Sequence, residues 1–239
     1  MLNKVSGNMY PWVTHTWNPV GGACPHKCTY CYIRRSFLGG TKYDGDPRLV
    51  EKYLNDDLGE GNFIFVQSAA DLFAHGVRSD IIKPILEKCK EHPDNHYLFQ
   101  SKNPQRIFTM ANTYGLPSNS LIATTIETNR ENSLANAPSR ISRRGSISTI
   151  NERTRFRTMI SIEPVMDFDV TEFTAWLWIS KPQVISIGAD SKQCDLPEPS
   201  ADKLKTLYDN IRSKLPHTEI KLKKNLKRLW DYGGEQHVP

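Results

Sequence analysis

The sequence lacks any long apolar segment. No apolar run approaches the roughly 20 residues that a helix needs to cross a bilayer, and residues 1–10 show no basic segment followed by an apolar stretch. We therefore expect no transmembrane helix, no secretion signal and no membrane partner, and we expect the protein to act in the cytoplasm. Cysteine is also scarce, with five among 239 residues, and a reducing compartment argues against a disulfide framework built from them.

Linkers and low-complexity segments are missing as well. No break in composition and no Gly/Ser-rich run divides the chain, so we expect a single domain over residues 1–239 with a sizeable buried core. The formal net charge is only +5, and the acidic residues are interspersed among the basic ones. This mild basicity is compatible with a polyanionic partner, but it does not by itself identify a nucleic-acid-binding protein.

Apolar runs alternate with amphipathic segments along the chain. We expect strands over residues 12–16, 63–66, 96–100, 121–126, 158–162, 184–187 and 219–222. We expect helices after Asp46-Pro47, from Ser79, after Asn103-Pro104, over 172–179 and from Ser200. This alternation predicts an α/β fold with a parallel sheet, either doubly wound or a complete or partial β/α barrel. In both architectures ligands bind at the carboxyl ends of the strands.

Two segments are rich in basic residues. Residues 129–157 combine many arginines with Ser and Thr, and they fit either a solvated loop and helix or a phosphate-contacting surface. The basic C-terminal stretch, residues 219–239, places lysines near aromatic residues, and it fits either a solvated terminal helix or a surface for single-stranded nucleic acid. The candidate nucleic-acid contacts in these segments are Arg140, Arg143, Arg144, Lys223 and Lys224.

Three of the five cysteines lie in one short loop, residues 21–32. Cys24, Cys28 and Cys31 have the spacing C-x3-C-x2-C, so three thiolates could hold three irons of one 4Fe–4S cluster, which normally takes four cysteines. No fourth cysteine lies nearby in the sequence, so one iron would be open to a ligand from outside the protein. The alternatives are a zinc site with a histidine as a further ligand and a chance grouping of free cysteines.

The cysteine spacing, with Tyr30 just before the last cysteine, resembles the signature of the radical S-adenosylmethionine (SAM) superfamily. The resemblance implies a partial (β/α)6-type TIM-like barrel with parallel strands and outer helices, and a 4Fe–4S cluster at its mouth. It also implies that the amino and carboxylate groups of SAM bind the fourth iron. One electron from a donor such as flavodoxin or ferredoxin would cleave SAM, and the resulting 5′-deoxyadenosyl radical would abstract hydrogen from a substrate.

The same resemblance points to further site residues. The superfamily often has Gly-Gly-Glu after the second strand to hold the amino group of SAM. Residues 67–71 lack those glycines, so Ser68 and Asp71 are the candidates there. Acidic residues that end later strands are also candidates, although each fits a loop residue or helix cap as well. The expected cofactor-binding set is Tyr30, Ser68, Asp71, Glu127, Glu163 and Asp190, and Cys194 is a candidate hydrogen donor to a product radical.

The overall layout also resembles a phage-associated radical SAM family with no established substrate. Asp-Leu-Phe follows the second strand at Asp71, and Glu-Pro follows a later strand at Glu163. A shorter similarity, around residues 28–32, is to the spore photoproduct lyase family, which repairs DNA. That similarity is too short to carry the DNA-repair function over. We expect a radical SAM enzyme, and the mild basicity, the two basic segments and the loose family analogy favour a nucleic acid or nucleotide as its substrate. A polypeptide or a small metabolite stays open as the substrate. The alternative is a non-catalytic iron–sulfur or zinc-containing nucleic-acid-binding module.

Overall fold

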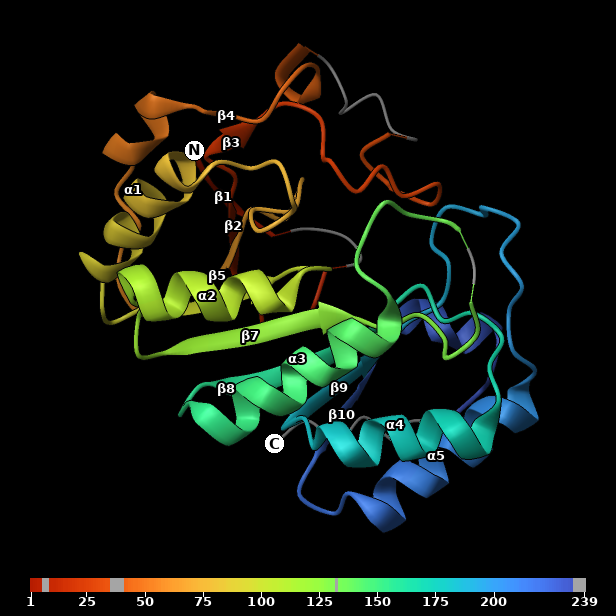
Figure 1. Cartoon of the computed structure of the whole chain (residues 1–239). Coiled ribbons are helices and arrows are strands. Elements are labelled where there is room, and N and C mark those ends of the chain that lie inside the picture. The colour runs from red at the N-terminus through yellow and green to blue at the C-terminus, as the bar shows by residue number, and fades with distance from the viewer. Residues whose placement is uncertain (6–8, 35–40, 132, 234–239) are drawn as a thin grey trace. The chain divides into compact units, whose positions relative to one another are not determined.

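The computed structural model describes residues 1–5, 9–34, 41–131 and 133–233 of the chain (Figure 1). The chain divides into two compact units, each with its own strands and helices. Unit 1 comprises Met1–Ala123 and Ser133–Pro138, and unit 2 comprises Thr124–Asn132 and Ser139–Pro239. The single domain expected over residues 1–239 stays a prediction.

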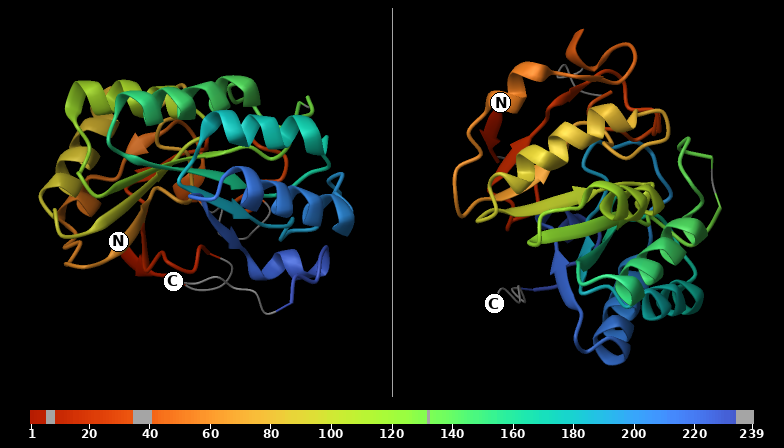
Figure 2. Two further views of the ribbon diagram at one scale, coloured as in Figure 1. Left: turned by 90° about the horizontal axis from the view of Figure 1, so that it is seen from below. Right: turned by 60° about the vertical axis from the view of Figure 1, so that its left-hand side comes forward.

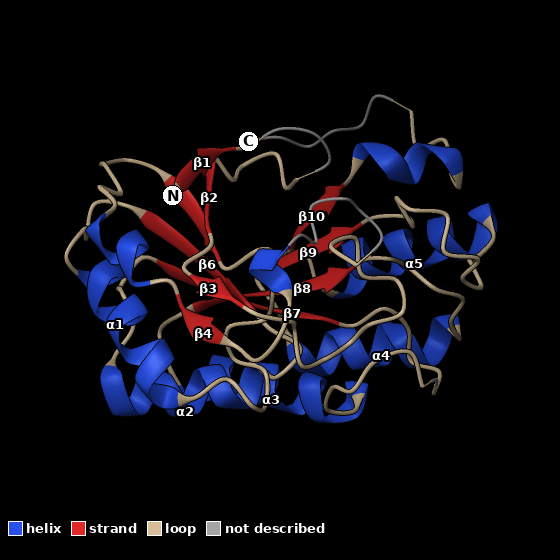
Figure 3. Ribbon diagram, turned by 90° about the horizontal axis from the view of Figure 1, so that it is seen from above, coloured by secondary structure: helices blue, strands red, loops and turns tan. Residues whose placement is uncertain are grey.

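Unit 1 is built on mostly parallel strands. β1 (Leu2–Lys4) pairs antiparallel with β2 (His15–Trp17). From β2 onward the neighbours are parallel, in the order β2, β5 (Phe63–Val66), β6 (His96–Gln100) and β7 (Ser120–Thr125). α1 (Ser79–Lys90) connects β5 to β6, and α2 (Pro104–Tyr114) connects β6 to β7 (Figure 3). This strand–helix–strand order places the carboxyl ends of β2, β5 and β6 at one edge of the sheet.

Two short elements complete unit 1. β3 (Val20–Gly21) pairs antiparallel with β4 (Arg48–Leu49). The 3₁₀ turns η2 (Thr41–Tyr43) and η3 (Glu51–Asn55) flank β4. The core of the unit lies between the strands and α1, whose apolar side chains recur at helical spacing and are buried: Ile81, Ile82, Ile85, Leu86 and Cys89.

Unit 2 has three parallel strands, β8 (Arg157–Ile162), β9 (Val184–Ile187) and β10 (Glu219–Leu222). The helices α3 (Arg140–Arg153), α4 (Val170–Ser180) and α5 (Ala201–Lys214) pack along them, and the 3₁₀ turn η4 (Lys224–Arg228) follows β10 (Figure 2). The Thr158 hydroxyl donates a 2.7 Å hydrogen bond to Asn151 of α3. Because side chains alternate along a strand, Met159 and Ser161 therefore lie on the face of β8 that is turned away from α3.

Most expected elements are confirmed. The strands at 63–66, 96–100, 184–187 and 219–222 have the expected bounds. The strand expected at 121–126 lies one residue earlier at both ends, and the strand expected at 158–162 begins one residue earlier. α1, α2, α4 and α5 lie where helices were expected, and Ser200 caps α5 by accepting a hydrogen bond from the backbone NH of Lys203. Part of the arginine-rich segment forms α3, in agreement with the loop-and-helix interpretation.

Two expectations are wrong. The strand expected over 12–16 is instead His15–Trp17. The helix expected after Asp46-Pro47 is replaced by β4 and η3. The reason is tertiary: Leu49 pairs with Val20, and the backbone NH of Val50 donates to the carbonyl of Pro19 at 2.8 Å. These bonds use backbone groups that an α-helix would need for itself.

Within the described part of the chain, none of the helices has both the length and the apolar character needed to cross a membrane.

Candidate functional site

The cysteine loop connects β3 to η2 in unit 1, at the edge where the parallel strands of this unit end. Two tight turns shape it: the backbone NH of Lys27 donates to the carbonyl of Cys24, and that of Cys31 donates to Cys28, both at 3.2 Å. Lys27 adopts a left-handed conformation with φ 47°. Cys28 is buried, whereas Cys24 and Cys31 are partly exposed. The loop therefore has a defined backbone that brings three thiols into one short stretch of chain.

Gly22 allows residues 42–46 to pack directly on this loop. The backbone NH groups of Gly22 and Ala23 donate to the carbonyls of Lys42 and Gly45, at 2.7 and 2.8 Å. Gly22 has φ +93°, and a Cβ atom added there would lie 2.2 Å from the carbonyl oxygen of Asp46. Only glycine fits both the conformation and the space.

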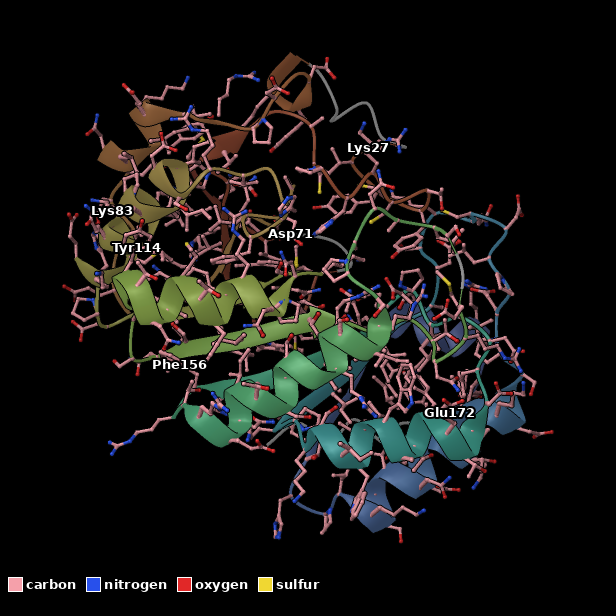
Figure 4. The ribbon with its side chains drawn as sticks, viewed as in Figure 1. Lys27, Asp71, Lys83, Tyr114, Phe156 and Glu172 are labelled. Atoms are coloured by element: carbon pink, nitrogen blue, oxygen red, sulfur yellow. The ribbon has the colours of Figure 1, made fainter. Side chains whose placement is uncertain are left out.

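Asp71, which follows β5, joins the cysteine loop to the end of β6 (Figure 4). One carboxylate oxygen accepts from the Phe73 backbone NH at 2.9 Å and from the Ser101 hydroxyl at 2.7 Å. The other is 2.9 Å from Nε2 of His26 and accepts from the Lys102 backbone NH at 2.7 Å. Burial acts to raise the pKa of Asp71, but the His26, Ser101 and Lys102 contacts outweigh it, and the pKa lies below its ordinary value. Asp71 is therefore an ionised carboxylate with four hydrogen-bond partners.

His26 is the member of the cysteine loop that reaches Asp71, and its side chain is only 2% exposed. Its Nδ1 lies 3.0 Å from the carbonyl oxygen of Asn136, and its Nε2 faces the Asp71 carboxylate. The imidazole of His26 is therefore held at both ring nitrogens, and it joins the cysteine loop to Asp71 and to Asn136.

Cys24 has a thiol with a raised pKa. Burial raises the pKa of its thiol to about 12 and the Asp71 charge adds to this, while backbone hydrogen bonds at His26 and Asp71 oppose the rise. Without a metal, this environment favours the protonated thiol, and a metal ion that bound there would replace the thiol proton. Among the described residues, no three His, Cys, Asp or Glu side chains are arranged to hold a metal ion. The donor set itself, three soft sulfurs in one loop, suits iron in a cluster.

The remaining site residues expected in unit 1 border the same loop. The ring of Tyr30 lies 5.4 Å from the Lys102 ammonium, a cation–π contact. The carbonyl of Ser68, just after β5, accepts from the Tyr32 hydroxyl at 2.9 Å, and its side chain contacts Asn18. The structure therefore brings Tyr30, Ser68 and Asp71 together around the cysteine loop.

In unit 2, Glu127 follows β7 and is fully buried. Nε of Arg140 and one terminal nitrogen of Arg143 each lie 3.1 Å from its carboxylate. Arg143 also donates to the carbonyl of Thr125. Arg144 instead stacks over the ring of Trp176 at 5.5 Å. Arg140 and Arg143, which were expected at a nucleic-acid surface, are thus engaged with Glu127, which was expected to bind the cofactor.

Glu163, Gly188 and Lys223 lie side by side at the carboxyl ends of β8, β9 and β10. The Lys223 ammonium donates to both Glu163 oxygens, at 2.8 and 2.9 Å, and its side chain is 6% exposed. A Cβ atom at Gly188 would lie 2.9 Å from the Glu163 carboxyl carbon, so the missing side chain makes room for this pair. Lys224 is exposed, whereas Trp230 and Tyr232 pack on each other at 5.7 Å. Residues 234–239 of the basic C-terminal stretch lie outside the described residues.

Asp190 and Cys194 belong to the segment after β9. The Asp190 carboxylate accepts from the backbone NH groups of Lys192, at 2.9 Å, and of Cys194. Cys194 is partly exposed, and its neighbours Gln193 and Asp195 are both left-handed, with φ 51° and 53°. Asp190 therefore fixes the backbone that presents Cys194.

Comparison with known proteins assigns the family. The family model described as "Protein of unknown function (DUF5131)" matches residues 8–180, more than half of the chain. The chain belongs to the DUF5131 family. No curated protein sequence matches it. The phage association expected from its layout stays a prediction.

Solved structures share the fold of this DUF5131 chain. A spore photoproduct lyase mutant with bound AdoMet and dinucleoside spore photoproduct has a TM-score of 0.63 at 13% identity, over 90% of this chain and 78% of that one. Spore photoproduct lyase complexed with dinucleoside spore photoproduct gives 0.62 at 12% identity, with the same coverage. Streptococcus suis SuiB bound to S-adenosylmethionine gives 0.58 at 12% identity, over 87% of this chain and 49% of that one. These likenesses confirm the expected α/β fold of the TIM-like type.

Some site residues of the DUF5131 chain were missed in the sequence. Ser101 and Lys102 were not singled out, although they directly follow the apolar strand β6, where polar residues at a carboxyl end are a signal. His26 was considered only as a histidine that could join a zinc site. Its partner Asp71 lies 45 residues away, and no local pattern links the two.

Proposed function

We propose that this chain is a radical SAM enzyme in which Cys24, Cys28 and Cys31 hold a 4Fe–4S cluster. The observation that carries the proposal is the three-thiol loop at the carboxyl edge of parallel strands, in a fold shared with structures that hold AdoMet. When bound, such a cluster supplies one electron that cleaves SAM to methionine and a 5′-deoxyadenosyl radical, and the proposal includes an electron donor such as flavodoxin or ferredoxin.

The chain's own residues supply binding and orientation around this chemistry. The three cysteines would hold the cluster as thiolates, and its fourth iron would be left for SAM. Tyr30 and Ser68 border the loop and are proposed to line the SAM site. Asp71 was expected to take the amino group of SAM, but its four hydrogen bonds favour a role within the loop. In unit 2, Glu163 and Asp190 stay proposed cofactor contacts, and Cys194 a proposed hydrogen donor.

We propose a nucleic acid or nucleotide as the substrate class. Support comes from the exposed basic side chains of η4 and from the likeness to a structure that holds a dinucleoside. Arg140, Arg143 and Lys223 add little, because buried or nearly buried carboxylates engage them.

The substrate class makes a salt-dependent prediction. Binding to single-stranded DNA should weaken as salt rises, with a log–log slope of about −0.7 per neutralised phosphate. Lys224→Gln should make the slope shallower by about 0.7, because it removes one phosphate contact. Lys205→Gln on α5, which removes an exposed lysine paired with Asp209, should leave it unchanged. A flat salt response in the unmodified protein removes the nucleic-acid substrate from the proposal.

The enzyme proposal is tested by anaerobic reconstitution. Protein treated with iron and sulfide should turn brown and bind about four irons per chain. Addition of SAM and dithionite should then release 5′-deoxyadenosine, measured by mass spectrometry. One equivalent of zinc, without brown absorbance and without SAM cleavage, would instead establish the non-catalytic module.

A further inference from the structure

We propose that a strip of three aromatic rings in unit 2 binds a single-stranded nucleic acid by stacking on its bases, while a cation at each end of the strip contacts its phosphates. The aromatic strip consists of Tyr208 on α5 and of Trp230 and Tyr232, which follow η4. The inference deepens the proposed function and rests on its substrate class, because it names the form of the nucleic acid and the residues that bind it. It does not depend on the cluster.

The ring of Trp230 lies at the centre of the aromatic strip. It is 5.4 Å from the ring of Tyr208 and 5.7 Å from the ring of Tyr232, at interplanar angles of 60° and 63°. Both tyrosines are only 8% exposed, whereas Trp230 is partly exposed. The two buried rings therefore hold the tryptophan in place, and the tryptophan presents part of its side chain to solvent.

The backbone around η4 fixes the position of the aromatic strip. Leu226 is fully buried, and its carbonyl accepts from the backbone NH groups of Leu229, at 2.9 Å, and of Trp230, at 3.1 Å. The Tyr232 hydroxyl donates to the carbonyl of Lys223, just after β10, at 3.3 Å. Rings that are already ordered lose little conformational entropy when a ligand stacks on them. The aromatic strip also begins at the carboxyl end of a parallel strand, where ligands of such folds bind.

A cation lies over each end of the aromatic strip. The Arg212 guanidinium is 5.8 Å from the centre of the Tyr208 ring, and the Lys227 ammonium is 5.6 Å from that of the Tyr232 ring. Both cations are exposed, and neither pairs with a carboxylate among the described residues. Single strands bind to this combination, because their bases stack on aromatic rings while their phosphates contact Lys and Arg. A duplex keeps its bases in its own stack, so it can use the cations but not the rings.

The first test uses the full wild-type chain as purified and three labelled probes of equal length. The probes are a single-stranded DNA oligonucleotide, the same strand without bases, and its duplex, and binding is measured by fluorescence anisotropy. The intact single strand should bind about 5- to 150-fold more tightly than the abasic strand, since stacking of one base on an aromatic ring is worth about 1–3 kcal/mol. Equal binding of the intact and abasic strands overturns the inference, because the surface then contacts phosphates alone.

The second test compares Trp230→Ala with Trp178→Ala. Trp178 also belongs to unit 2, on α4, and is 52% exposed, but it is not part of the aromatic strip. Trp230→Ala should weaken binding of the single strand about 5- to 150-fold and leave the log–log salt slope unchanged, because it removes stacking and no charge. Trp230→Phe should restore most of the affinity, and Trp178→Ala should bind like the wild type. Equal losses in the two alanine variants, or no loss in Trp230→Ala, overturn the inference.

A charge variant tests the ends of the aromatic strip. Lys227→Gln should make the salt slope for the single strand shallower by about 0.7, because it removes one phosphate contact. An unchanged slope overturns the role of this cation. The comparison of probes on the wild-type chain needs no variant, so it decides on the stacking role even if Trp230→Ala does not fold.

The outcome is separable from that of the enzyme proposal. If the chain binds the intact strand through Trp230 but reconstituted protein releases no 5′-deoxyadenosine, the radical SAM proposal fails and the aromatic strip stands. If 5′-deoxyadenosine forms while the intact and abasic strands bind alike, the aromatic strip fails and the enzyme stands.

Discussion

Cys28→Ala protein is expected to lose iron, sulfide and SAM cleavage together. Three sulfurs are the least that hold a 4Fe–4S cluster with one open corner, and removal of one leaves two protein ligands for four irons. Loss of a mere outer-shell partner already costs about 10–100-fold in metal affinity or activity, so loss of a ligand should exceed about 100-fold. The measurements are iron and sulfide per chain after anaerobic reconstitution, and 5′-deoxyadenosine after addition of SAM and dithionite.

Cys89→Ala is the matched control for this prediction. Cys89 also belongs to unit 1, but it is fully buried on α1 among apolar side chains. Its replacement by alanine leaves a small cavity and should destabilise the fold by about 1 kcal/mol, without changing iron content per folded chain. A Cys28→Ala protein that kept wild-type iron and 5′-deoxyadenosine would contradict the three-ligand site, and equal losses in both variants would show a general folding defect.

The parts of the fold that could be predicted are those that local patterns determine. The strand at 63–66 is a continuous apolar run, and such a run between helical segments indicates a buried parallel strand. The segment after Asp46 has an equally good helical period, yet it forms β4 and η3. Its backbone pairs with residues near the cysteine loop that lie nearly 30 positions away, and tertiary pairing overrides the local pattern there.

In the candidate site, too, local patterns predict some features and not others. The three cysteines are recognisable because their spacing is local. The partners of Asp71 are not, because Ser101 and Lys102 lie 30 and 31 residues from it. Arg143 shows a different failure: in sequence it reads as one charge on a polar helix, but α3 turns it inward to the buried Glu127. A carboxylate placed at a strand end is satisfied by a cation from the following helix, which charge patterning alone does not reveal.

Gly22→Ala is expected to be the most destabilising substitution among the residues that hold the cysteine loop in place. The left-handed conformation of Gly22 costs an alanine roughly 1–2 kcal/mol, and the added Cβ would lie 2.2 Å from the backbone oxygen of Asp46. Backbone cannot rotate away as a side chain does, so the segment must shift, and overpacking of this kind typically costs about 1–3 kcal/mol. The free energy of unfolding, measured by denaturant titration, should fall by about 3 kcal/mol or more.

Gly61→Ala separates the conformational cost of an alanine at positive φ from the steric cost of its Cβ atom. Gly61 also has a positive φ, +67°, but nothing lies within 4 Å of a Cβ atom added there, so its variant should show only the conformational cost of roughly 1–2 kcal/mol. The difference in the free energy of unfolding between the two variants then measures the steric cost of the contact between residues 42–47 and the cysteine loop. If Gly22→Ala lowers the free energy of unfolding no more than Gly61→Ala does, residues 42–47 do not pack closely on the cysteine loop. If it lowers the free energy of unfolding more than Gly61→Ala does and also lowers iron uptake, Gly22 is part of what shapes the loop for its ligand role.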